Sequence, residues 1–96
     1  MKESQSLTNN LLMEVDVLST RLRNIKQSYK TTENKALKVR LFSENKNIFN
    51  RVKEIHKTAE LLNKKNYEKT NFSNLLLEIT KRILNENKFE SNLFFL

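Results

Sequence analysis

The sequence predicts an all-α protein: a three-helix up-down-up bundle of antiparallel, coiled-coil-like helices that is oligomeric. Apolar residues recur at alternating spacings of four and three, which place them on one face of a helix. The 96 residues include no glycine and no proline, so hairpin turns lack their usual residues and nothing forces a helix to break. A single domain of this length buries a modest core, so we expect it to be stabilised by another chain.

The first helix is predicted for residues 5–30. Its apolar residues follow spacings of 4, 3, 4, 3 and 4, the heptad pattern of a helix that buries one narrow stripe. Glu14 and Asp16 lie early in this helix and basic residues lie late, which suits the helix dipole. The predicted seam residues are Leu11, Val15, Leu18, Leu22, Ile25 and Tyr29.

A break is predicted between residues 30 and 35, where Thr31 or Thr32 can cap a second helix with Glu33 in its first turn. One alternative is an unbroken helix, because residues spaced by four continue through this region: Tyr29, Glu33, Leu37, Leu41 and Asn45. A lone extended helix cannot bury its seam, so this alternative requires a dimer or a hetero-complex.

The second helix is predicted for residues 34–64. Phe42, Phe49 and His56 each follow a seam residue directly, and such a second row can face another helix. Asn45 lies in the seam, where it either fixes register and partner number or is partly solvated near the helix start. The predicted seam residues are Leu41, Asn45, Ile48, Val52, Ile55, Ala59 and Leu62.

The third helix is predicted for residues 71–88 and is followed by an apolar tail at 89–96. One side of this helix carries Phe72, Leu75, Leu76, Ile79 and Ile83. Leu77 and Leu84 lie on a flank that packing within one bundle is expected to leave uncovered. Either the tail folds back onto its own bundle or, together with this flank, it binds a partner. The predicted partner-binding residues are Leu77, Leu84, Phe89, Leu93, Phe94, Phe95 and Leu96.

The net charge of +7 is concentrated in residues 33–70, which contain ten Lys or Arg against five Glu. A basic surface of this kind can bind nucleic acid through its phosphates, in a salt-sensitive way. Interleaved glutamates are equally typical of an ordinary solvated helix face. The candidate anion-binding residues are Arg23, Lys26 and Lys30 on the first helix and Lys46, Lys53, Lys57 and Lys64 on the second.

The residues give no catalytic, metal or cofactor site. One His, one Asp and no Cys offer few pairs for acid–base or nucleophilic chemistry. A di-iron bundle needs Glu-x-x-His pairs, but Lys53 stands three residues before His56. The stretch IHKTAELL resembles a histidine phosphotransfer domain, which implies phosphotransfer at His56 beside Lys53 and Lys57. It departs from that family in lacking a Gly shortly after the Lys.

The sequence therefore favours a non-enzymatic assembly or adaptor subunit that acts by coiled-coil-type protein–protein interaction. It would self-associate, join a larger complex, or both. The main alternative is a basic bundle that binds nucleic acid through the second helix. The polar start MKESQSLTNN, and Glu14 and Asp16 within LLMEVDVL, predict neither a signal peptide nor a membrane span. The absence of cysteine suits a cytoplasmic or nuclear location.

Overall fold

The computed structural model describes the backbone of residues 2–65 and 71–91, and the side chains of residues 7–64 and 73–86. Within these residues all regular secondary structure is helical and there is no strand, so the predicted all-α class is confirmed. The bounds of the three helices differ from the predicted bounds by at most three residues. The helices are α1 (Lys2–Thr31), α2 (Lys35–Lys65) and α3 (Asn71–Ser91).

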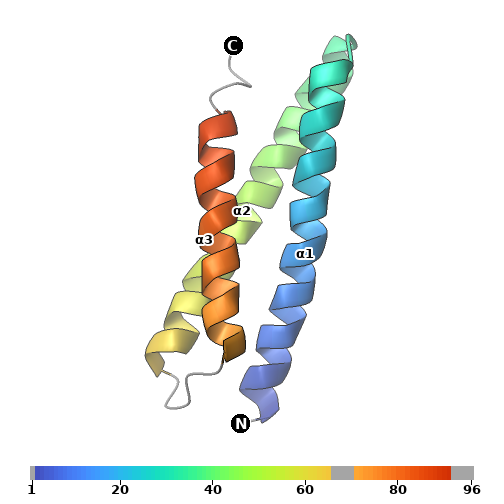
Figure 1. Cartoon of the computed structure of the whole chain (residues 1–96). Coiled ribbons are helices and arrows are strands. Elements are labelled where there is room, and N and C mark those ends of the chain that lie inside the picture. Colours follow the sequence, from blue (N-terminus) through green and yellow to red (C-terminus); the bar gives the residue numbers. More distant parts are fainter. Residues whose placement is uncertain (1, 66–70, 92–96) are drawn as a thin grey trace.

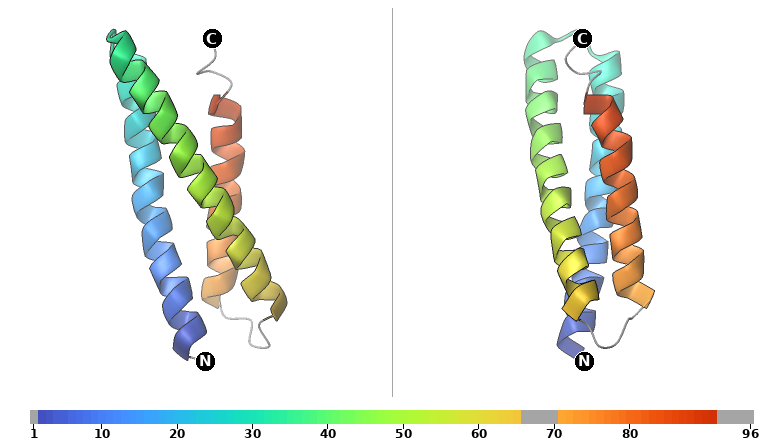
Figure 2. Two further views of the ribbon diagram at one scale, coloured as in Figure 1. Left: turned by 180° about the vertical axis from the view of Figure 1, so that it is seen from behind. Right: turned by 90° about the vertical axis from the view of Figure 1, so that its left-hand side faces the viewer.

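The three helices form an elongated bundle with Cα extents of 51 × 20 × 15 Å. Each helix contacts both of the others. α1 and α2 lie together at the end where they are joined and diverge towards the other end (Figures 1 and 2). α3 starts at the end where α1 starts and α2 finishes, and it packs along the open side of this pair (Figure 1).

The turn between α1 and α2 is fixed by Asn34. The Asn34 side-chain Oδ1 accepts a 3.1 Å hydrogen bond from the backbone N–H of Leu37, which is the geometry of a helix N-cap. Thr31, one of the two predicted caps, instead ends α1 and donates its hydroxyl to the Gln27 carbonyl at 3.0 Å. The other, Thr32, accepts a 3.2 Å bond from the Asn34 N–H. The capping prediction was therefore wrong by two or three residues, and the unbroken helix is excluded.

The core lies along the predicted seams of α1 and α2, where every seam position is buried or partly buried. Asn45 is only 5% exposed, so the expectation of a partly solvated seam asparagine does not hold. The buried apolar residues are Leu11, Val15, Leu22, Ile25, Leu41, Ile48, Val52, Ile55, Ala59, Leu76 and Ile83.

The buried face of α3 agrees with the predicted one only in part: Leu76 and Ile83 are buried and Ile79 packs against the core. Ser73 and Thr80, which are polar, are fully buried, whereas Leu75, which was expected on the apolar side, is 48% exposed. The hydroxyls of Ser73 and Thr80 have hydrogen-bond partners on α2. Ser73 Oγ donates to Asn63 Oδ1 at 3.1 Å, and Thr80 Oγ1 lies 2.8 Å from His56 Nδ1. Compared with the predicted orientation, α3 is therefore rotated about its own axis, and this rotation turns Leu77 towards the bundle.

Two bidentate ion pairs join α1 to α2. Arg21 binds Glu44 with Nη2–Oε2 at 2.9 Å, and Arg51 binds Glu14 with Nη2–Oε1 at 2.8 Å. Hydrogen bonds from Arg51 lower the pKa of Glu14, and those from Arg21 lower the pKa of Glu44. Because these side chains remain more than a third exposed, each pair contributes little to stability. Their main effect is to fix how α1 and α2 align.

Candidate partner-binding surfaces

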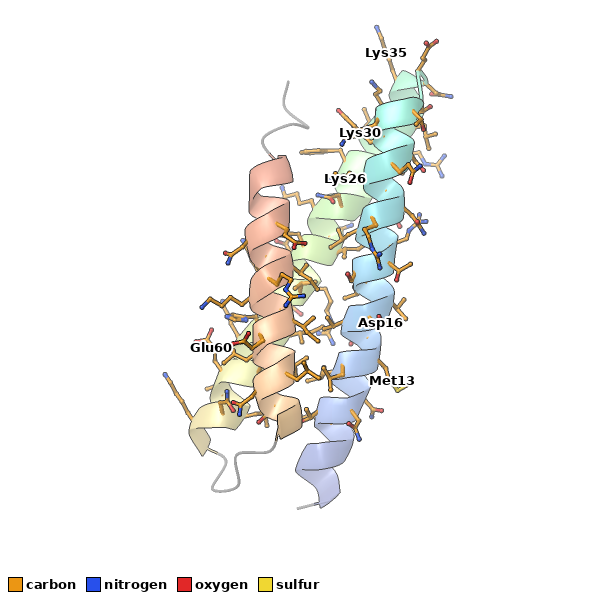
Figure 3. The ribbon with its side chains drawn as sticks, viewed as in Figure 1. Met13, Asp16, Lys26, Lys30, Lys35 and Glu60 are labelled. Carbon is orange, nitrogen blue, oxygen red and sulfur yellow. The ribbon has the colours of Figure 1, made fainter. Side chains whose placement is uncertain are left out.

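The outward face of α1 carries a second stripe with heptad spacing, which we call the outer α1 stripe. All its residues are exposed and none is charged. Met13 and Val17, near its middle, are 69% and 66% exposed, and Met13 lies on the side of α1 turned away from α3 (Figure 3). The stripe consists of Asn10, Met13, Val17, Thr20, Asn24 and Gln27.

This stripe is unusual for a chain in which 30% of residues are charged. Solvent-facing helix surfaces normally carry charged side chains. A stripe at spacings of 3, 4, 3, 4 and 3 is instead the pattern by which one helix packs along another. Sequence reasoning missed it because only two of its members are apolar, although the spacing and the lack of charge were both visible.

The outward face of α2 follows the ordinary pattern. The predicted row of Lys46, Lys53, Lys57 and Lys64 is exposed along this helix. The Lys53 ammonium lies over the Phe49 ring, 4.8 Å from its centroid, and shields an aromatic side chain from water. α2 therefore presents a row of cations to solvent.

A groove of about 320 Å³ runs between α1 and α3. Arg23 and Lys26 of the predicted basic row on α1 line this groove, and Lys26 extends from α1 towards α3 (Figure 3). Lys30 lies nearby, on the adjoining surface of α1. Arg82 and the acidic Glu86 of α3 also line the groove. Sequence reasoning missed Arg82 because the third helix has no net charge. The groove thus combines cations, one carboxylate and an apolar floor.

His56 forms a polar joint between α2 and α3. Its Nδ1 lies 2.8 Å from Thr80 Oγ1, and its Nε2 lies 3.2 Å from a carboxylate oxygen of Glu60. The Thr80 hydroxyl also donates to the Leu76 carbonyl at 2.9 Å, so His56 Nδ1–H is the donor towards Thr80. With Nδ1 protonated, Nε2 bonds to the Glu60 carboxylate only when the ring carries a second proton, and otherwise its lone pair faces that carboxylate. A phosphoryl acceptor needs such a lone pair, so phosphotransfer at His56 stays a prediction.

The predicted partner-binding residues are placed only in part. Leu77 and Leu84 pack against the core and are partly buried, so the expected uncovered flank is not what the structure shows. The reason is the rotation of α3 around the buried Ser73 and Thr80. The Phe89 side chain and the tail residues Leu93, Phe94, Phe95 and Leu96 lie outside the described residues.

The described residues contain neither a candidate metal site nor a candidate membrane span. No group of three or more His, Asp or Glu side chains in that part of the chain is arranged to hold a metal ion. None of the described helices combines the length and apolar content that crossing a membrane requires. Comparison with known proteins gives no match to a protein-family model, to a curated protein or to a solved structure.

Proposed function

We propose that this up-down-up bundle is a non-enzymatic assembly or adaptor subunit that acts by coiled-coil-type protein–protein interaction. The observation that carries the proposal is the outer α1 stripe. Its own bundle already buries the opposite seam of α1, from Leu11 to Tyr29, so the stripe is free to pair with a further helix. Two helix-pairing faces on one helix are what an assembly subunit needs.

The proposal assigns the binding energy to a small number of side chains. Met13 and Val17 can each bury most of their surface on pairing, and apolar burial contributes about 25 cal/mol per Å². The surrounding amide and hydroxyl side chains can form hydrogen bonds with a partner at little desolvation cost compared with charged groups. The apolar tail at 93–96 remains a predicted second contact that would add specificity.

A double substitution, Met13→Glu with Val17→Glu, tests this proposal. We expect it to reduce association of the full chain, measured as mass by light scattering and as capture of partners from the native source. The matched control is Val39→Glu on α2, because Val39 is 68% exposed and lies outside the outer α1 stripe. Association that responds equally to both changes, or to neither, refutes the proposal.

The exposed lysine row on α2 supports a second candidate function, which is binding of nucleic acid through phosphate contacts. Such binding would weaken steeply with salt, because each neutralised phosphate releases counterions. Replacing Lys46, Lys53, Lys57 and Lys64 by Gln is expected to abolish retention on DNA or heparin in that case. Retention that is lost even below physiological salt would remove this candidate.

A further inference from the structure

We propose that the outer α1 stripe pairs with the same stripe of a second copy of this chain, and that the two α1 helices run antiparallel. This inference rests on the proposed function and names the partner. The spacing of the stripe reads the same from either end, about a midpoint between Val17 and Thr20. An antiparallel pair therefore brings Val17 against Thr20 of the second copy, and Met13 against Asn24.

The outermost layer of the stripe also suits this register. Asn10 of one copy lies opposite Gln27 of the other, and these two amide side chains can donate to and accept from each other. The inner layers thus each pair one apolar side chain with one polar side chain, and the outermost layers are hydrogen-bonded. The paired segments span about 26 Å, at 1.5 Å per residue.

Charge complementarity along one edge of the stripe selects the second copy as the partner. Asp16 and Arg23 flank the stripe on the same side and are both exposed. In an antiparallel pair, equivalent edges face each other, so Asp16 of each copy meets Arg23 of the other and two symmetric ion pairs form. Within the part of the chain that the structure describes, neither residue forms an ion pair. Their charges are available for this contact.

The opposite edge of the stripe has the same complementarity. Glu14 and Arg21 flank it there, and an antiparallel pair brings Glu14 of one copy towards Arg21 of the other. Each is already bound within its own chain, to Arg51 and Glu44 respectively. A second copy would extend these pairs into a charge network without placing like charges together.

Charge reversal in the full chain tests this register. Asp16→Arg is expected to weaken self-association by about tenfold, because two surface ion pairs become two repulsions. Adding Arg23→Asp to Asp16→Arg should restore association, since the opposite charges are then exchanged. The control is Glu78→Arg, which changes the charge equally on an exposed position of α3. Mass is measured by light scattering over a dilution series, because an interface of this size gives concentration-dependent association.

Cross-linking distinguishes the two possible orientations. The chain has no cysteine, so single cysteines can be introduced without interference. Met13→Cys mixed with Asn24→Cys should cross-link through a short bismaleimide, whereas Asn24→Cys alone should not, because its two sulfurs would be about 16 Å apart along the axis. A parallel pair would reverse this result. It would also place Asp16 opposite Arg21, so the exchanged double variant would not regain association.

The outcomes separate this inference from the proposed function. A chain that stays monomeric at high concentration overturns the inference, as does Asn24→Cys cross-linking to itself. If that monomeric chain still loses partner capture in the Met13→Glu, Val17→Glu variant, the proposed function stands with a different partner. If the variant changes neither mass nor capture, both fail.

Discussion

Replacing Thr80 by valine tests the polar joint between α2 and α3. Thr80 is completely buried, and its Oγ1 lies 2.8 Å from His56 Nδ1. Valine keeps the shape of the side chain and replaces the hydroxyl by a methyl group, whose burial stabilises by about 0.8 kcal/mol. It also leaves the His56 N–H without its partner, which costs about 1–3 kcal/mol. His56 is 21% exposed and can recover some hydration, so we expect a net loss of about 1 kcal/mol in unfolding free energy.

The measurement is urea unfolding of the full chain, followed by circular dichroism at fixed concentration. His56→Leu completes a double-mutant cycle, because removing both polar partners is far less costly than removing one. We expect the unfolding free energy of the double variant Thr80→Val, His56→Leu to be about 1 kcal/mol higher than the sum of the two single losses predicts. A stabilising Thr80→Val, or additive effects in the cycle, would refute the assignment of this contact as a stabilising hydrogen bond.

Three further predictions use the same unfolding assay. Leu76→Ala should cost about 3 kcal/mol because Leu76 is completely buried, whereas the control Leu75→Ala, at an exposed site, should stay within about 0.5 kcal/mol. Asn34→Ala should cost about 1 kcal/mol through loss of the α2 cap, and Asn34→Asp should not. Because the pKa values of Glu14 and Glu44 are lowered, the stability that their ion pairs contribute should be fully present above the ordinary carboxyl value of 4.5 and should be lost below it, since the unfolded chain then takes up protons first. Glu14→Gln should flatten that loss.

Much of the fold could be predicted from the sequence because helix periodicity is a local property. The 4-3 spacing from Leu11 to Tyr29 gave the buried face of α1, and the same spacing gave the buried face of α2. The polar residues between the two helices predicted the break that separates α1 from α2. The cap was misplaced because Thr31, Thr32 and Asn34 are all competent capping residues, and only the path of the turn selects among them.

The candidate surfaces were less predictable. Arg82 reaches the groove beside Arg23 and Lys26 only because α3 packs against α1, which no local pattern specifies. The outer α1 stripe was present in the sequence, but its meaning depends on the opposite face of α1, which the bundle itself buries. A stripe of amides and hydroxyls becomes informative only once it is known to face solvent.

The sequence by itself determined that the chain forms helices, where they run and which faces of α1 and α2 are buried, since apolar spacing acts within each helix. The tertiary structure alone decided how α3 is rotated. Ser73 and Thr80 are buried there because Asn63 and His56 on α2 satisfy their hydroxyls. Hydrophobic burial does not specify a single rotation of a helix with apolar residues on two sides, whereas hydrogen bonds, being directional, do.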